Sequence, residues 1–191
     1  ICWWVKYNSN AITIALDYRA HTQSDGGWSV YSESGEVGFD YDNAGGTGAW
    51  GSGLHSSGGA TPVNTWIHGA VVQTGSAITL YKNASVGETE STGKQMLDAA
   101  GTYRSLIIGG GYNSNGTRTA TTINGHMDQV LIYSGFGMSS PQLTALYNSG
   151  NGKASIGTLG GLIFHEEYTD GTNTANAATK FLVFVWKRYC S

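Results

Sequence analysis

The sequence predicts an all-β fold: an antiparallel β-sandwich with one short helix. Three observations lead to this prediction. Apolar and polar residues alternate with a period of two in many segments, as they do in strands that bury one face. The chain has 29 Gly but only two Pro among its 191 residues, which is typical of many tight turns between short strands. Only the segment near residues 140–148 has the start and stop signals of a helix.

We expect residues 1–191 to form a single domain. All-β sandwiches reach this length as one unit, and 40% hydrophobic residues are enough for a core. The net charge of −3 without a polybasic run argues against binding to nucleic acid. The longest apolar run, residues 181–186, is far shorter than the ~20 residues that cross a bilayer, so no membrane insertion is expected. Because residue 1 is Ile, we interpret the chain as processed or as a piece of a longer polypeptide.

Strands are expected wherever the alternation is regular. In the segment 12–17, Ile12, Ile14 and Leu16 are expected to share one face. Residues 65–72 and 77–82 flank a polar turn and predict a hairpin. Further strands are expected at residues 27–31, 36–41, 106–108, 127–133, 161–165 and 181–186.

Two long segments are rich in Gly, Ser, Thr and Asn, at residues 42–64 and 109–124. Long loops in compact domains tend to be functional or mobile, so these are the first places to search for a binding site. A short strand is expected around Ala49-Trp50 within the first segment. Residues 87–105 are polar and only weakly patterned.

The predicted helix has recognisable ends. Ser140 is expected to cap it, Pro141 suits its first position and Gly150 suits its end. Leu143, Leu146 and Tyr147 follow the helical spacing and predict one apolar face. A helix of about two turns is stable only when it packs against the rest of the domain.

The two cysteines, Cys2 and Cys190, lie at opposite ends of the chain. Their placement suggests that the first and last strands are neighbours and are joined by a disulfide, which would contribute up to ~5 kcal/mol by constraining the unfolded chain. The alternative is a pair of buried thiols that never react with each other.

Five motifs in this order resemble the laminin-G-like branch of the concanavalin A-like lectins, which are jelly-roll sandwiches. They are Trp4-Val5-Lys6, Trp66-Ile67-His68, Leu80-Tyr81-Lys82-Asn83, the strand from Gly125 through Tyr133, and the helix from Ser139 through Tyr147. The likeness covers roughly residues 3–152.

The chain departs from the family pattern in several places. Met127 and Gln129 replace the usual Ile and Glu, and Ala84 replaces a Gly. The strand that normally precedes Trp-Val-Lys is missing, and we expect residues 161–191 to supply the closing strands. The resemblance implies a domain that binds rather than catalyses, and a role for Asp128 in holding a neighbouring loop.

The sequence offers little for catalysis. Glycosidases need two carboxylates across a cleft; Asp40 and Asp42 share a strand face, but no third acid follows them as it does in hydrolases of this architecture. No Gly-x-Ser-x-Gly motif is present. No catalytic residue is therefore assigned, and a glycoside hydrolase is the third of three readings.

Calcium is the one cofactor considered. Asp40, Asp42 and Asn43 form the best cluster of oxygen ligands, at the end of a strand that faces a Gly-rich segment, and hard cations prefer such oxygens. Members of the family often hold calcium near such loops. The alternative is an ordinary Asx turn without a metal.

For sugar binding, an exposed aromatic ring beside amides or carboxylates is the expected pattern. Trp50 stands among Gly and Ala residues too small to bury it, and Tyr112-Asn113 is a similar element in the second Gly-rich segment. With Asp42 and Asn43 they form the predicted ligand site. By contrast, Trp3, Trp28, Trp66 and His68 lie in alternating strands and are interpreted as structural residues.

Two functional hypotheses follow. The first is a non-enzymatic recognition module, for carbohydrate or a cell surface, within a larger secreted or viral assembly. The second is a structural virion component, a capsid decoration or fibre protein, whose partners are neighbouring subunits. Either hypothesis places the chain outside the cell or on a virion surface.

Overall fold

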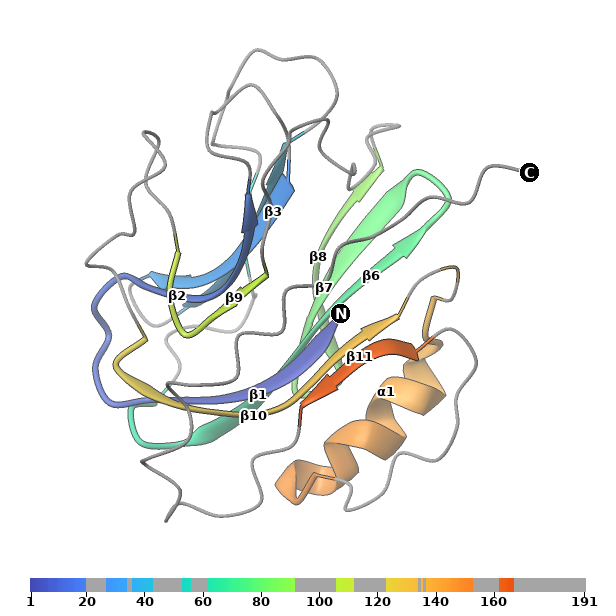
Figure 1. Cartoon of the computed structure of the whole chain (residues 1–191). Helices are drawn as coiled ribbons and strands as arrows, with labels where there is room; N and C mark the ends of the chain where they lie inside the picture. Colours follow the sequence, from blue (N-terminus) through green and yellow to red (C-terminus); the bar gives the residue numbers. More distant parts are fainter. Residues whose placement is uncertain are drawn as a thin grey trace.

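The computed structural model describes residues 1–19, 27–33, 36–42, 53–55, 62–91, 106–111, 123–133, 135, 137–152 and 162–166. These residues form two antiparallel sheets that face each other, with one short α-helix on the outside of the larger sheet (Figure 1). The predicted fold class, an all-β sandwich with one short helix, is confirmed.

The larger sheet has six strands in the order β11-β10-β1-β6-β7-β8. Strand β1, the first of the chain, therefore lies in the middle, between β10 and β6. The bounds are β1 (Cys2–Tyr7), β6 (Trp66–Thr74), β7 (Ala77–Lys82), β8 (Ser85–Ser91), β10 (Gly125–Tyr133) and β11 (Leu162–Glu166).

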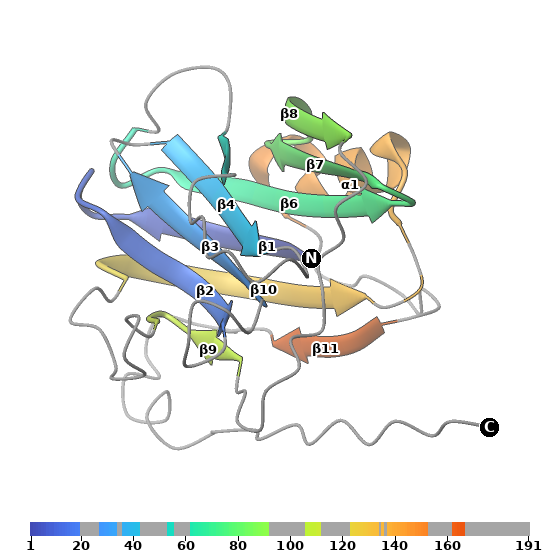
Figure 2. The same ribbon diagram turned by 90° about the horizontal axis from the view of Figure 1, so that it is seen from above.

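The smaller sheet has five strands in the order β5-β4-β3-β2-β9. Figure 2 shows its strands lying across those of the larger sheet. The bounds are β2 (Thr13–Arg19), β3 (Gly27–Glu33), β4 (Glu36–Asp42), β5 (Gly53–His55) and β9 (Ile107–Ile108).

The main core fills the space between the two sheets. Alternate side chains of each strand point inward, so β1 contributes Trp3 and Val5 while β3 and β4 contribute Val30 and Phe39, all of them fully buried. Burying each such side chain stabilises the fold by about 1.5–3 kcal/mol. This packing is the reason for the period-two pattern in the sequence.

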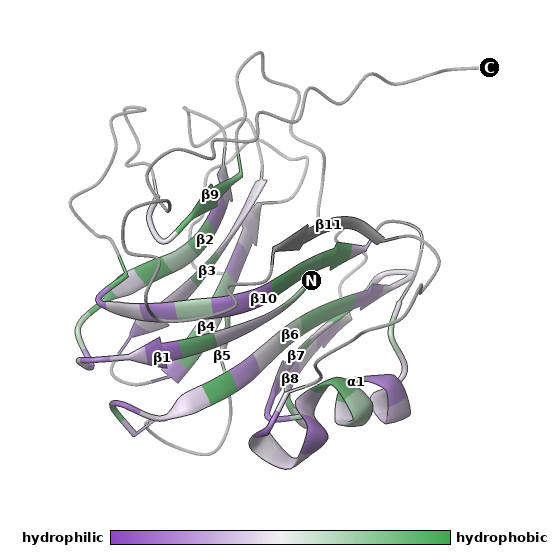
Figure 3. Ribbon diagram, turned by 60° about the horizontal axis from the view of Figure 1, so that its bottom comes forward, coloured by the Kyte–Doolittle hydropathy of each residue, from purple (hydrophilic) through white to green (hydrophobic). Residues whose placement is uncertain are grey.

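A second core lies on the opposite face of the six-stranded sheet, beneath the helix. Its buried members are Cys2, Ala70, Val72, Leu131, Met138, Leu143 and Leu146. Figure 3 shows hydrophobic stretches along β6, β10 and α1. The middle of the larger sheet is therefore covered on both faces.

The helix α1 (Ser140–Tyr147) lies where it was expected, and Leu143 and Leu146 are its buried residues. Its ends differ from the prediction. Ser139, not Ser140, is the N-cap, because its backbone N–H and its hydroxyl both donate to Gln142 Oε1 at 2.8 Å. Asn148, with φ of 45°, ends the helix before Gly150. The short 3₁₀ helix η1 (Asn148–Gly150) follows.

The expectation that Ile12, Ile14 and Leu16 share one face is wrong. The pairing of β2 with β3 shifts register between Ile14 and Leu16, as a β-bulge does. Ala15 and Leu16 are consequently both buried, whereas Ile12 precedes β2 and is 56% exposed. Simple alternation does not extend through a bulge.

The hairpin of β6 and β7 is confirmed, with a tighter turn than expected at Gly75-Ser76. A second tight turn, at Asn83-Ala84, leads directly into β8, and both of its residues have positive φ. Strand β8 includes the first residues of the segment 87–105, whose sequence is polar and weakly patterned. It is polar because it is an edge strand with little contact to the core.

Strand β11 confirms the strand expected near residues 161–165, and it pairs with β10 at the edge of the sheet. The strand expected at residues 181–186 and the one near Ala49-Trp50 lie outside the described residues. The single domain over residues 1–191 therefore stays a prediction. The structure describes no helix that is long and apolar enough to cross a bilayer, and α1 has only eight residues.

Candidate functional site

Of the residues predicted to bind a ligand or a metal, the structure describes the side chain of Asp40 alone. Asp40 and Asp42 both belong to β4, and Asp42 pairs with Gly27 at the end of that strand. The side chain of Asp42 and all of Asn43, Trp50, Tyr112 and Asn113 lie outside the described residues. Whether these residues form one site remains a prediction.

Asp40 lies on the face of the five-stranded sheet that points away from the core. It forms a polar row with Ser29 of β3 and Asp17 of β2, which pair across the sheet. The Tyr31 hydroxyl donates a hydrogen bond to Asp40; burial, and then the Asp40 charge, raise the pKa of Tyr31. Because Asp17 and Ser29 are buried, this row is closed to a large ligand.

The described residues contain no group of three or more His, Cys, Asp or Glu side chains able to hold a metal ion. The Asp40 carboxylate already accepts a hydrogen bond from Tyr31, which uses one of its oxygen lone pairs. Calcium binding by Asp40, Asp42 and Asn43 stays a prediction.

The two Gly-rich segments leave the five-stranded sheet at opposite ends. Strand β4 ends at Asp42, beside Gly27. Strand β9 runs from Ile107 to Ile108, antiparallel to β2, and so ends in the direction of Thr13, at the other end of the sheet. The predicted Trp50 and Tyr112 elements are therefore attached to opposite ends of the same sheet.

A different group of side chains lies in the open on the outer face of the six-stranded sheet. Lys6 in β1 pairs with Trp66 in β6 on one side and with His126 in β10 on the other. Trp66 is 39% exposed, and His126 is also exposed. We call Trp66, Lys6 and His126 the aromatic row. The interpretation of Trp66 as a structural strand residue does not account for this exposure.

The side chains of the aromatic row lean toward one another. The Lys6 ammonium lies 5.5 Å from the centroid of the Trp66 ring, within the range of a cation–π interaction. The rings of Trp66 and His126 are 6.5 Å apart between centroids and tilted by 53°. One apolar ring and two nitrogen-bearing side chains thus converge over β1.

The neighbouring row toward the helix is closed. It consists of His68, Trp4 and Asp128, paired across the same three strands. Tyr147, at the end of α1, stacks on Trp4 with the ring centroids 6.0 Å apart and an angle of 20°. The cover by the helix therefore ends between this row and the aromatic row.

His68 is deeply buried in the closed row, with 2% of its surface exposed, in line with its interpretation as a structural residue. Its ring lies 5.3 Å from that of Trp4. Burial, with a smaller effect of the N-terminal charge, lowers the pKa of His68 to about 4. Its Nδ1 has no hydrogen-bond partner among the described residues. The imidazole is thus neutral at physiological pH.

Polar backbone turns border the aromatic row on its other side. The Asn8 N–H donates to the Asn124 carbonyl at 2.8 Å, and the Asn64 N–H donates to the Tyr7 carbonyl at 2.7 Å. The side chains of Asn8, Asn64 and Asn124 are exposed, each two residues along the chain from a member of the row. Asn8 Nδ2 donates to Asn124 Oδ1 at 3.4 Å and Asn124 Nδ2 donates to Ser9 Oγ at 3.3 Å, so these amides form a polar border at the end of the row.

The alternation of side chains along the strand could have identified Trp66 as a residue of the outer face. Ile67 and Val71 point into the main core, so Trp66 must point the other way. The sequence does not show where the cover on that second face ends, because the helix that provides it lies more than 70 residues later.

Cys2 is buried in the second core, and its Sγ lies 3.7 Å from Met138 Sδ. Burial raises the pKa of the Cys2 thiol. No disulfide partner for Cys2 occurs in the described ranges, and Cys190 lies outside them. The bridge between Cys2 and Cys190 therefore stays a prediction.

Comparison with protein families places this fold. The model of a family described as the Concanavalin A-like lectin/glucanases superfamily matches residues 1–144. The chain belongs to this superfamily. No curated protein sequence matches the chain.

Solved structures similar to this superfamily member share its fold at low identity. A heptameric SAP-like pentraxin from Limulus polyphemus has a TM-score of 0.57 and 18% identity, over 79% of this chain and 69% of the pentraxin. The CBM40 of a Ruminococcus gnavus IT-sialidase, solved with alpha2,3 sialyllactose bound, has a TM-score of 0.58 and 19% identity, over 76% of this chain and 80% of the module. At such identities the likeness concerns the fold alone.

Proposed function

We propose that the chain is a non-catalytic carbohydrate-recognition module in which Trp66 is the platform for a sugar ring. The observation that carries this proposal is an exposed tryptophan, bordered by Lys6 and His126, on a sheet of a lectin-superfamily sandwich. An indole presents a flat apolar surface that matches the C–H face of a pyranose, while neighbouring polar groups bind its hydroxyls.

The exposure of Trp66 is unusual within the described part of the chain. Trp3 is fully buried, Trp4 is 6% exposed and Trp28 is 8% exposed, whereas Trp66 is 39% exposed. Trp66 contributes nothing to the main core, so its size is not explained by core packing. A ligand that covers the ring would gain the apolar burial that the fold leaves unused.

The comparisons support a glycan as the ligand class. The family description names lectins, and a module of similar fold was solved with an oligosaccharide bound. The predicted loop residues Trp50, Tyr112, Asn113, Asp42 and Asn43 belong to the same proposal as a second place where a sugar could bind. We place the module in an extracellular setting, within a larger secreted or viral protein.

A glycan array followed by titration calorimetry on the strongest hits tests the proposal. We expect Trp66→Ala to weaken binding about tenfold, since stacking against an aromatic ring contributes about 0.5–1.5 kcal/mol beyond the apolar area that it buries. Val86→Ala is the matched control because Val86 is 56% exposed on β8, away from the aromatic row. It should leave binding unchanged.

Trp50→Ala is measured in parallel to locate the site. If it abolishes binding while Trp66→Ala has no effect, the sugar binds at the Gly-rich segment and Trp66 is not the platform. If no glycan binds the unmodified protein, the module proposal is wrong. That result would favour the alternative in which neighbouring subunits cover these faces. Light scattering would then detect an assembly of many copies.

A further inference from the structure

We infer that the aromatic row recognises an anionic sugar: a pyranose that stacks on Trp66 and places a carboxylate or sulfate against Lys6 and His126. This inference rests on the proposed function and specifies the ligand class at the same site. It depends on the charge of the row, whereas the proposed function depends only on the Trp66 ring.

Lys6 supplies the fixed positive charge of the row. Its ammonium lies 5.5 Å from the Trp66 centroid, and the side chain is half-buried between Trp66 and His126. Within the described residues Lys6 has no ion pair with a carboxylate. A lysine held over one face of an aromatic ring by a cation–π contact keeps its three N–H donors for an anion, and a sugar can stack on the other face.

The closest acidic residue on this face, Asp128, is already engaged. Asp128 lies in the closed row, paired with Trp4, and its Oδ1 accepts a 2.8 Å hydrogen bond from the Gln129 N–H. This hydrogen bond leaves the charge of Asp128 in place, but no ion pair joins Asp128 to Lys6 among the described residues.

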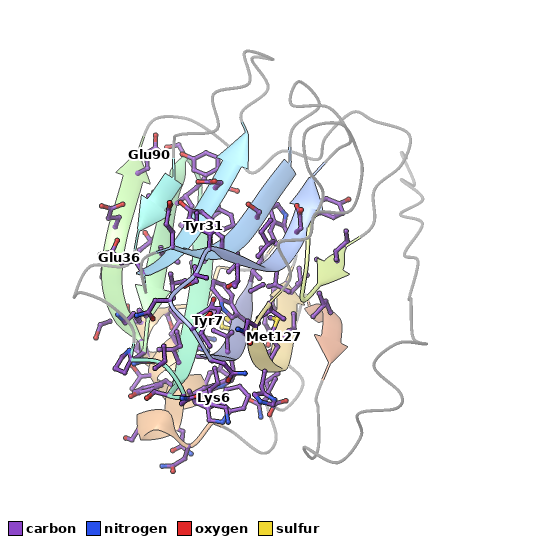
Figure 4. The ribbon with its side chains drawn as sticks, turned by 90° about the vertical axis from the view of Figure 1, so that its left-hand side faces the viewer. Lys6, Tyr7, Tyr31, Glu36, Glu90 and Met127 are labelled. Atoms are coloured by element: carbon purple, nitrogen blue, oxygen red, sulfur yellow. The ribbon has the colours of Figure 1, made fainter. Side chains whose placement is uncertain are left out.

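The other described carboxylates gather around β3, β4 and β8. Besides burial, the charges of Asp40, Glu33 and Glu88 raise the pKa of Tyr31. Glu90 accepts a hydrogen bond from the Tyr41 hydroxyl. Figure 4 shows Lys6 at the opposite end of this view from Glu90. Among the described residues, these carboxylates therefore lie away from the aromatic row (Figure 4), and Asp128 is the one acidic side chain in the row next to it.

His126 adds a second donor on the far side of Lys6. Its ring is exposed and is 6.5 Å from that of Trp66 between centroids. Lys6 and His126 are direct neighbours across the sheet, so both can reach the two oxygens of one carboxylate or two oxygens of one sulfate. The stacked ring fixes the orientation in which these charge-assisted hydrogen bonds form.

The test compares three probes of matched length: a neutral galactan oligosaccharide, an oligogalacturonate and a sulfated galactan oligosaccharide. Calorimetry at low ionic strength is expected to show at least one anionic probe binding about tenfold more tightly than the neutral one, the effect of one charge-assisted hydrogen bond. The preference should shrink as salt is added.

Four variants separate charge from stacking. Lys6→Gln should remove most of the preference for the anionic probes, Lys6→Arg should retain it, and His126→Gln should lower it by a smaller amount. Trp66→Ala should weaken all three probes. Thermal melting confirms that each variant is folded.

Equal affinity of the unmodified protein for all three probes, with Trp66→Ala still weakening them, overturns this inference and leaves the proposed function standing. A preference for anions that Lys6→Gln does not change overturns it as well. Absence of binding to every probe and to the glycan array overturns both.

Discussion

At the scale of single residues, His68 shows most clearly what the second face of the large sheet does to a polar group. The imidazole lies under the end of α1, where it contacts the rings of both Trp4 and Tyr147. Its Nδ1 is buried without a partner in the described structure, which costs about 1–3 kcal/mol. The residue is tolerated there because it is neutral.

The depressed pKa of His68 makes stability depend on pH. Between its ordinary value of 6.5 and about 4, the unfolded chain binds a proton that the folded chain does not. The contribution of His68 to the free energy of unfolding should therefore have its full value above pH 6.5. It should fall as the pH drops through this window, by roughly 3 kcal/mol in total.

Urea unfolding at pH 7.5, 5 and 4 measures this effect. His68→Gln removes the titrating group but leaves the other ionisable residues, so it should show a shallower loss over the same window. Parallel pH profiles for the two proteins would show that His68 does not titrate in this way.

The site was only partly predictable at this scale. Parity assigns Trp66 and His68 to the same face of β6, and the structure agrees. One of them is nevertheless open and the other closed, because α1 and η1 extend over His68 and stop before Trp66. That difference depends on the docking of a distant helix, which no local pattern contains.

At the scale of elements, the pairing of β1 with β6 depends on one glycine. Gly69 pairs with Trp3, and a Cβ at Gly69 would lie 2.3 Å from two atoms of the Trp3 ring. The ring is fully buried, so it has no free direction in which to move. The glycine is required for the space it leaves, since the indole occupies the place of its missing side chain.

Gly69→Ala should therefore destabilise the protein by about 1–3 kcal/mol through overpacking. Chemical denaturation of Gly69→Ala, Trp3→Leu and the double variant gives the coupling between the two positions. The double variant should lose clearly less than the sum of the single variants, because the smaller side chain makes room for the new methyl group. Strictly additive losses would contradict the close contact.

Elements with strong local signals were predictable from the sequence. The hairpin of β6 and β7 and the helix near residue 140 follow from turn residues and apolar spacing, and both are present. The irregularities were not. The bulge in β2 hides its inward residues, and the edge position of β8 leaves it without an apolar pattern.

At the scale of the whole molecule, the six-stranded sheet separates two cores of different size. One core joins the two sheets, and the other joins the sheet to α1. The aromatic row lies beyond the second core, where the helix no longer covers the sheet. The candidate site is thus a consequence of helix length: a longer α1 or η1 would have buried Trp66 as it buries Trp4.

The predicted bridge between Cys2 and Cys190 would join the two ends of the chain. Cys2 occupies the second core beside Met138, and β11 adds a late strand next to β10. Both observations concern the larger sheet, which is where a bridge to Cys190 would attach. The sequence predicts this bridge from the positions of the two cysteines alone, and it stays a prediction.

Because the large sheet is covered on both faces, its amide hydrogens should exchange with solvent at very different rates. Water reaches a backbone amide only when its hydrogen bond opens, and strands packed on both faces open last. In deuterium oxide, the amides of β1 and the middle of β6 should be the slowest to exchange, and those of the edge strand β8 should exchange early, as mass spectrometry of peptides would record. Saturating sugar should then slow exchange at the first residues of β6, beside Trp66, without altering the centre of the sheet.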